Sequence, residues 1–206
     1  SDAAAQASQL VLLESNFSCM PSVVLEGRRV VNNIERSASL FLVKNIFSFL
    51  MSIFSMAFML SYPLKPSQIS LISMFTIGVP AFLLAMEPKK KMIHGHFLSN
   101  VLLKALPAGL TDVFVVSFLT VFGLEFGLTS EETATAATLL WGMVGLMLLF
   151  KISTPMNKFR WTVWIAMLIG LLFCFFGLKD LFAIGQITRR CGMVLVVFAT
   201  ATVPLL

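Results

Sequence analysis

Asn32-Asn33-Ile34-Glu35-Arg36-Ser37 leads directly into Ala38-Ser39-Leu40-Phe41-Leu42-Val43-Lys44-Asn45-Ile46-Phe47-Ser48, and this stretch decides the fold. The first six residues are mostly polar, whereas the run that follows stays largely apolar to about Leu60. Because no Gly or Pro separates the two parts, we expect one helix to pass from water into a bilayer. Such a helix is a stalk that can carry motion between a water-soluble domain and a site in the membrane.

The composition predicts an integral membrane protein. Hydrophobic residues make up 58% of the 206 residues and charged residues only 12%, which is about half the charged share of a soluble domain. The net charge of +5 does not predict nucleic-acid binding, because the basic residues form short clusters beside apolar runs, as membrane topology requires. Cys19, Cys174 and Cys191 are far apart, so they predict neither a disulfide framework nor a metal cluster.

Three regions follow from the pattern of apolar runs. Residues 1–20 predict a short helix, a short buried strand at Leu10-Val11-Leu12-Leu13 and a turn, too little to bury a core, so we interpret them as the tail of a cytosolic domain. Residues 21–36 are the predicted stalk. Residues 37–206 are the predicted transmembrane domain, a bundle of six helices at about 37–61, 68–86, 97–124, 133–150, 161–178 and 191–206.

The last predicted span is short, and we therefore expect the chain to be a piece of a longer protein. From Cys191 it has room for roughly 24 Å of helix, against a hydrocarbon core of roughly 30 Å. The chain also begins at Ser1, without a Met and without the layout of a signal peptide.

The basic clusters predict that both termini are cytosolic. Clusters on the expected cytosolic side are Arg28, Arg29 and Arg36 before the first span, Lys89, Lys90 and Lys91 after the second, and Lys151, Lys158 and Arg160 between the fourth and fifth. Loops on the other side are acidic or nearly neutral. Arg189 and Arg190 depart from this pattern, and we expect them to reach toward lipid headgroups.

Polar residues inside the first span are candidates for a transport pathway. A charge and an amide are costly in hydrocarbon, and Lys44 and Asn45 place one of each there. Asn45, Ser48, Ser52 and Ser55 follow one another at spacings of three, four and three, which places them on one helical face. This face either lines a pathway or packs against another helix through its small residues.

Two further features lie in the second and third spans. Gly78 and Pro80 interrupt the second span and free backbone carbonyls, which is tolerated only where protein or a hydrated cavity receives them, although an ordinary kink would need the same residues. Asp112 is a possible buried charge in the third span. It either pairs with a cation such as Lys104, two turns earlier on the same face, or belongs to a proton path.

Residues 1–34 resemble the segment of P-type ATPases that closes the phosphorylation domain and opens transmembrane helix five, and the resemblance covers the whole chain. The resemblance is carried by Ala7-Ser8-Gln9-Leu10-Val11-Leu12-Leu13-Glu14-Ser15-Asn16-Phe17, Glu26-Gly27-Arg28-Arg29-Val30 and Asn32-Asn33-Ile34. It implies that residues 1–20 are the remnant of an α/β HAD-like domain and that the six spans are helices five to ten of a ten-helix pump. Leu40-Phe41-Leu42-Val43-Lys44, with residues 71–85, is similar to the bacterial group called cation-transporting ATPase E.

The resemblance implies a function for the whole pump that this chain does not carry alone. Such a pump hydrolyses ATP with Mg²⁺, phosphorylates the Asp of an Asp-Lys-Thr-Gly motif and moves a cation across the cell membrane. That motif is absent from these 206 residues, so no catalytic residue is predicted here. The implied partners are the upstream domains of the pump, the transported cation and membrane lipids.

Ligand positions carry over only in part. Asn45 stands where calcium pumps of the family have an Asn ligand, but Ser48 replaces a Glu, Ile77 an Asp and Ser73 an Asn. The sequence therefore lacks three of the four ligand types of the family's calcium site, and no metal ligand is assigned from the sequence. The predicted transport pathway consists of Lys44, Asn45, Ser48, Ser73, Thr76, Gly78 and Pro80.

Two alternative functions stay open. Lys44-Asn45 is similar to the Lys-Asn pair of helix five in lipid-flipping P-type ATPases, and a fixed cation would pair with a lipid phosphate or repel a divalent ion. A non-enzymatic channel or carrier with six helices is the other alternative, and the cytosolic segment ahead of the first span argues against it.

Overall fold

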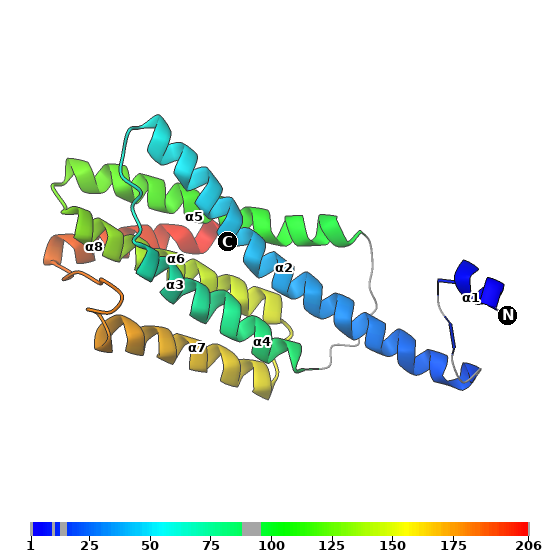
Figure 1. Cartoon of the computed structure of the whole chain (residues 1–206). Coiled ribbons are helices and arrows are strands. Elements are labelled where there is room, and N and C mark those ends of the chain that lie inside the picture. Colours follow the sequence, from blue (N-terminus) through cyan, green and yellow to red (C-terminus); the bar gives the residue numbers. More distant parts are fainter. Residues whose placement is uncertain (1, 10, 13–15, 88–95, 206) are drawn as a thin grey trace.

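The structure is a computed structural model that describes residues 2–9, 11–12, 16–87 and 96–205, and every regular element in these ranges is a helix (Figure 1). The predicted all-α class is therefore confirmed for this part of the chain. The elements are α1 (Asp2–Ala7), η1 (Phe17–Cys19), α2 (Met20–Ala57), α3 (Pro66–Ser73), η2 (Met74–Gly78), α4 (Val79–Ala85), α5 (Phe97–Glu125), α6 (Ser130–Ser153), α7 (Lys158–Gly177), α8 (Arg189–Thr202) and η3 (Val203–Leu205).

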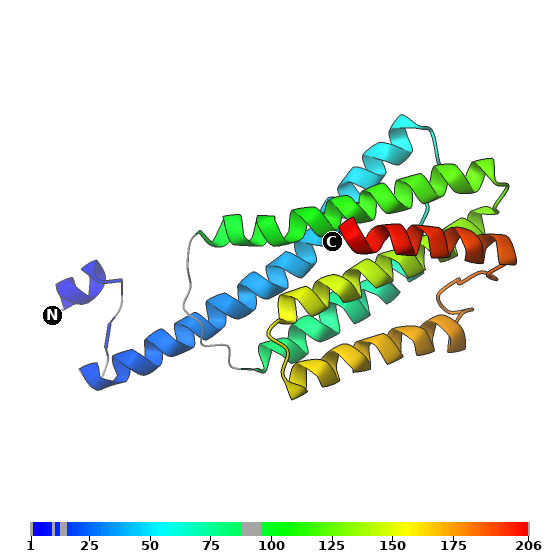
Figure 2. The same ribbon diagram turned by 180° about the vertical axis from the view of Figure 1, so that it is seen from behind.

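The predicted stalk is continuous with the first span. α2 runs for 38 residues without a break, begins with Pro21 in its first turn, and ends where Met59 takes a left-handed backbone (φ 52°). The Leu60 N–H then donates to the Ser55 carbonyl across 2.9 Å and closes the last turn. The first part of α2 projects beyond α3 to α8 in both views (Figures 1 and 2), and residues 21–27 are exposed.

The other helices pack beside the second half of α2. α2 packs most extensively along α5, α5 packs on α6, and α6 lies between α8 on one side and α7 on the other (Figures 1 and 2). α3, η2 and α4 follow one another as a single rod from Pro66 to Ala85, which contacts α2, α6 and α7. The core between these helices is apolar and includes Phe47, Met51, Leu71, Leu84 and Leu119.

Five helical segments of the described chain are long and apolar enough to cross a membrane: Phe17–Ala57, Pro66–Ala85, Phe97–Glu125, Ser130–Ser153 and Lys158–Gly177. Large apolar side chains such as Phe49, Phe118 and Phe173 point outward on these helices, where lipid would cover them. The chain is therefore a multi-pass helical membrane protein.

The predicted sixth span is not confirmed. A helix does lie there, but α8 has 14 residues before a 3₁₀ turn follows it. At 1.5 Å per residue this is about 21 Å of helix, less than the hydrocarbon thickness. Thr188 caps its N-terminus by accepting from the Cys191 N–H, so the helix begins two residues earlier than predicted.

Two predictions fall wholly or partly outside the described residues. The basic loop Lys89-Lys90-Lys91 lies outside them. Of the predicted strand, Leu10 and Leu13 lie outside, while Val11 and Leu12 are described and belong to no strand. Val11 is also exposed rather than buried.

Candidate functional site

A small buried cavity lies where α2, η2, α5 and α6 meet, and it brings together residues from all four elements. Its volume is about 10 Å³, enough for one water molecule. It is lined by Leu40, Val43 and Lys44 from α2, Thr76 and Ile77 from η2, Asp112 from α5, and Trp141, Gly145 and Leu148 from α6. We refer to it as the central cavity. A lysine, a hydroxyl and a carboxylic acid at one buried point make it the candidate site.

The η2 wall of the central cavity is a π-helical turn, and Gly78 and Pro80 stand at its end. The Val79 N–H donates to the Met74 carbonyl, five residues back. Pro80 has no N–H, so it leaves a carbonyl of the preceding turn without its helical donor. Single π-turns inside α-helices are frequent at functional sites. The sequence predicted that Gly78 and Pro80 interrupt the second span, and the structure shows a π-helical turn at that place.

Close contacts hold the walls of the central cavity in place. A Cβ atom added at Gly145 would lie 2.7 Å from Thr76 Cγ2, so only glycine lets α6 approach η2 this closely. A Cβ atom added at Gly109 would likewise lie 2.8 Å from Ile46 Cγ2, between α5 and α2. The Phe47 and Trp141 rings stack with their centroids 4.6 Å apart. These contacts fix Lys44, Thr76 and Asp112 around the same small space.

The predicted Asp112–Lys104 pair is wrong. Lys104 instead forms an ion pair with Glu35 of α2, because α2 packs along this side of α5 and places a carboxylate beside the lysine. Asp112 is 1% exposed, and neither of its carboxylate oxygens accepts a hydrogen bond from any described residue. The Trp141 indole lies near the carboxylate but outside hydrogen-bond geometry.

The other predicted pathway residues do not share one environment. Asn45 is exposed, Ser48 is partly buried, and Ser55 is buried without a hydrogen-bond partner for its hydroxyl in the described ranges. Ser52 is exposed and donates to the Ser48 carbonyl of its own helix. The four residues therefore lie on one face of α2, and Ser55 is the one of the four that is buried in the protein interior.

The predicted pathway residues on α3, η2 and α4 also differ in their exposure. Ser73 is partly buried with an unpartnered hydroxyl, Thr76 is buried and lines the central cavity, Gly78 is exposed and Pro80 is buried. Of the seven predicted pathway residues, Lys44 and Thr76 therefore meet at the central cavity.

Sequence reasoning missed a second polar site, at the end of α4. Arg160 donates from Nε to Glu87 Oε2 across 2.6 Å and from Nη1 to the carbonyls of Ser153 (3.0 Å) and Pro155 (2.7 Å). Asn157, which caps α7, also donates to Glu87. Arg36 of α2 interacts electrostatically with both Arg160 and Glu87. It donates from Nη1 to the Leu84 carbonyl at 3.0 Å. We call Arg36, Glu87, Asn157 and Arg160 the arginine cluster.

The arginine cluster fixes the charge of Glu87. Burial by itself raises the pKa of this carboxyl group, but hydrogen bonds from Arg160 and Asn157 and the positive charges of Arg160 and Arg36 outweigh burial and lower the pKa below its ordinary value. In the sequence, Arg36 and Arg160 were recognised as basic residues near span ends and were interpreted as topology alone.

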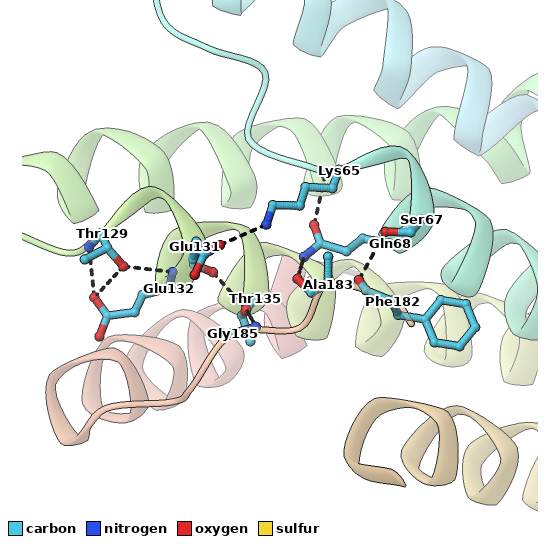
Figure 3. Close-up of polar contacts among 10 residues, drawn as sticks. All are labelled: Lys65, Ser67, Gln68, Thr129, Glu131, Glu132, Thr135, Phe182, Ala183 and Gly185. Carbon is cyan, nitrogen blue, oxygen red and sulfur yellow. Dashed lines mark hydrogen bonds and ion pairs between the residues drawn. The ribbon is translucent and has the colours of Figure 1, made fainter. Parts of the chain in front are cut away.

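At the opposite end of the bundle, polar contacts join the loop after α7 and the starts of α3 and α6 (Figure 3). Lys65 pairs with Glu131 at 3.1 Å, and the fully buried Gln68 donates to the Ala183 carbonyl at 3.0 Å while its side-chain oxygen accepts from the Lys65 N–H. Gly185 donates to the Thr135 hydroxyl at 2.8 Å. The loop after α7 is thereby tied to the starts of α3 and α6, so this end of the bundle is held together.

The fold and the central cavity define a class of protein: a multi-pass helical membrane protein with buried ionisable groups between its helices, the feature that marks substrate and ion paths in membranes. No family model matches the chain. Known proteins do match. The chain is 37% identical over 163 residues to the probable cation-transporting ATPase exp7 of Streptococcus pneumoniae, a match that covers 75% of this chain and 21% of that protein.

Other relatives carry similar names. The calcium-transporting ATPase CtpE of Mycobacterium tuberculosis is 33% identical over 175 residues, covering 78% of this chain and 22% of the relative. A calcium-transporting ATPase of Bacillus subtilis is 37% identical over 86 residues, covering 42% of this chain and 10% of the relative. The chain is thus homologous to P-type cation-transporting ATPases, and the predicted resemblance is confirmed. It spans about a fifth of the length of the first two relatives.

Proposed function

We propose that this chain is the membrane portion of an ATP-driven pump that moves a cation across the cell membrane. One observation carries the proposal: the uninterrupted α2 begins outside the bundle and places Lys44 at the central cavity beside the π-helical turn. The relatives named above are cation-transporting ATPases, calcium-transporting in two cases, so calcium is the first cation to test.

The rest of the pump enters the proposal through homology. ATP and Mg²⁺ would act in domains that precede α2, and residues 1–20 would be the end of the HAD-like phosphorylation domain. The helical segments from α2 to α8 would be transmembrane helices five to ten of the pump, with both termini of the chain in the cytosol. The continuous α2 supports this arrangement, because a rigid helix can transmit a displacement from a soluble domain to the central cavity.

The central cavity supports a cation more than a lipid. Its volume of about 10 Å³ suits a water-sized occupant, whereas a lipid phosphate group is several times larger. A divalent cation needs about six oxygen ligands or more, and Asp112 is the one carboxylate that lines the cavity among the described residues. We therefore propose that Asn45, exposed on α2, and segments outside this chain supply the remaining ligands.

The experiment is transport by the full-length ATPase in proteoliposomes, with cation-stimulated ATP hydrolysis as the readout. Asn45→Ala should lower the apparent cation affinity without changing thermal stability, because the side chain is exposed in the described fold. Ser52→Ala is the matched control, since Ser52 is exposed on the same face and its hydroxyl donates to the Ser48 carbonyl of its own helix. Unchanged cation dependence in Asn45→Ala would remove Asn45 from the pathway.

The same assay separates the alternatives. Lys44→Ala should alter the preference among cations, because it removes a fixed positive charge from the central cavity. Hydrolysis stimulated by lipid and indifferent to cations would identify a flippase instead. Cation flux without ATP hydrolysis would identify a channel or carrier, and either result would overturn the proposal.

A further inference from the structure

A second pocket, of about 270 Å³, opens at the end of the bundle that lies opposite the arginine cluster. Its walls come from the loop after α2 (Ser61 and Lys65), the end of α5 (Leu124) and the start of α6 (Ser130 and Thr133). We call it the Lys65 pocket. Its volume lies just below the range of roughly 300–1,000 Å³ that holds drug-sized ligands, so the pocket fits a somewhat smaller group.

Several hydrogen-bonding groups of the Lys65 pocket are free to receive a ligand. Ser61, Ser130 and Thr133 line the pocket, and their hydroxyl groups form no hydrogen bond with any described residue. Ser130 is also the first residue of α6, so the N–H groups of Ser130 and Glu131 have no acceptor within the helix. Together with the Lys65 ammonium group, these donors favour a group that carries several oxygens and a negative charge, such as a phosphate.

The charges beside the Lys65 pocket are nevertheless balanced. Lys65 Nζ lies 3.1 Å from Glu131 Oε1, and the two side chains are 42% and 66% exposed (Figure 3). An exposed pair of this kind contributes at most about 1 kcal/mol, so a ligand can separate its members at little cost. A purely anionic ligand would be attracted by Lys65 and repelled by Glu131, whereas a zwitterion can satisfy both.

Apolar side chains continue the Lys65 pocket onto the outer surface of the bundle. Leu124 lines the pocket and is 58% exposed. Phe58 and Met59 stand directly before the lining residue Leu60, and both are exposed, Met59 at 94%. Polar donors inside the pocket and exposed apolar side chains beside it match an amphiphile. A soluble zwitterion would leave these apolar side chains uncovered.

We propose that the Lys65 pocket binds the headgroup of a zwitterionic phospholipid that carries a primary ammonium group, namely phosphatidylethanolamine. The phosphate accepts hydrogen bonds from Lys65 and from the free hydroxyl groups, and the ammonium group donates to Glu131. The acyl chains lie along the apolar side chains at the ends of α2 and α5. The binding site is independent of the proposed transport, because it requires neither ATP hydrolysis nor a particular cation.

The first test measures lipid binding by the purified full-length ATPase. Phosphatidylethanolamine, phosphatidylglycerol and phosphatidylcholine are added separately to the protein in detergent, and native mass spectrometry counts the bound lipid. Wild type should bind phosphatidylethanolamine most tightly. Lys65→Gln should weaken this binding by about tenfold, the effect of losing one charge-assisted hydrogen bond. Lys179→Gln is the matched control, because Lys179 lines a different pocket at the same end of the bundle.

Two further variants test the headgroup and the fit. Glu131→Gln should reduce the preference for phosphatidylethanolamine over phosphatidylglycerol, because it removes both the acceptor for the ammonium group and the repulsion of an anion. Ser61→Phe should lower the binding of phosphatidylethanolamine by filling part of the pocket. The melting temperature of lipid-free Ser61→Phe should match wild type, since Ser61 is exposed in a loop.

Four outcomes would overturn the proposal. Equal affinity for the three lipids, unchanged in Lys65→Gln, would mean that lipid covers this surface without a specific site. Tighter binding of phosphatidylglycerol would identify an anion site instead. Displacement of the lipid by an equal concentration of soluble ethanolamine phosphate would show that the acyl chains contribute nothing. A wild-type protein that binds no phosphatidylethanolamine would show that another part of the pump covers the pocket.

Discussion

Arg160 Nε and Glu87 Oε2 are 2.6 Å apart, and this ion pair joins the start of α7 to the residue that follows α4 by two positions. The Arg160 and Glu87 side chains are 9% and 15% exposed. Arg160 also donates from Nη1 to two backbone carbonyls, so the pair is both enclosed and further hydrogen-bonded. An ion pair of this kind matters most when one partner is removed, because the other is left enclosed and uncompensated.

Removing one partner should therefore be strongly destabilising. We expect Arg160→Ala to lower the free energy of unfolding by about 3–5 kcal/mol, measured by denaturant unfolding of the purified protein in detergent micelles. The matched control is Lys65→Ala, which breaks the exposed Lys65–Glu131 pair and should cost at most about 1 kcal/mol. Equal losses in the two variants would contradict the enclosed character of the Arg160–Glu87 pair.

The lowered pKa of Glu87 also predicts how the stability of the fold depends on pH. Its pKa in the folded protein lies below its ordinary value, because the hydrogen bonds from Arg160 and Asn157 and the nearby positive charges outweigh burial. Its stabilising contribution is therefore fully present above the unfolded pKa of about 4.3 and is lost as the pH falls through the folded pKa. Melting temperatures measured between about pH 3 and pH 6 should show a shallower acid decline in Glu87→Gln. A decline as steep as that of wild type would argue against this assignment.

Gly145 tests the close approach of α6 to the π-helical turn. A Cβ atom at this position would lie 2.7 and 2.8 Å from two carbons of Thr76, so Gly145→Ala must displace the turn. We expect a loss of about 1–3 kcal/mol and a lower cation affinity of the pump. Gly27→Ala is the control, because nothing lies within 4 Å of the added carbon on the exposed stalk. Gly27→Ala should stabilise α2 by about 0.5–1 kcal/mol. If Gly27→Ala instead lowered stability, the loss seen in Gly145→Ala could not be assigned to the contact with Thr76.

The sequence predicted the helices well because their signals are local. Pro21 stands in the first turn of α2, where the predicted stalk begins. A capping box of Thr129 and Glu132, which the sequence analysis did not use, starts α6 three residues before the predicted span. These signals lie within a few residues of the element they define. The hydrophobic runs then locate five apolar helices of the described chain that are long enough to span a bilayer, while α8 has 14 residues.

The sequence could not predict which helices meet. Spacing along α5 suggested Lys104 as the partner of Asp112, but the structure pairs Lys104 with Glu35, which is 69 positions away. Arg160 and Glu87 are separated by 73 positions, so no local pattern connects them. The face that contains Asn45 was identified by periodicity, yet periodicity does not say what that face contacts. Helix pairing is a tertiary property, and it decides the candidate site.

The stalk is also attached directly to the second rod. Asn33 Nδ2 donates to the Ala85 carbonyl and Arg36 Nη1 to the Leu84 carbonyl, each across 3.0 Å. These carbonyls belong to the last turn of α4, where helical N–H donors run out and where a positive charge interacts favourably with the helix dipole. The Leu84 carbonyl also accepts from the Glu87 N–H at 3.3 Å. Two side chains of α2 therefore cap α4, the helix that follows the π-helical turn.

Loss of this attachment should uncouple the stalk from the central cavity. In Arg36→Gln of the full-length ATPase, we expect fewer cations transported per ATP hydrolysed, because a displaced α2 would no longer move the end of α4 with it. The ratio is measured in proteoliposomes from parallel uptake and phosphate-release assays. Arg29→Gln is the control, since Arg29 forms an ion pair with its neighbour Glu26 on the exposed part of α2. If Arg36→Gln instead kept the wild-type ratio of cations to ATP and unfolded at a lower temperature, that result would show that Arg36 stabilises the contact between α2 and α4 without transmitting motion. A purely structural contact changes stability and leaves the stoichiometry of transport intact.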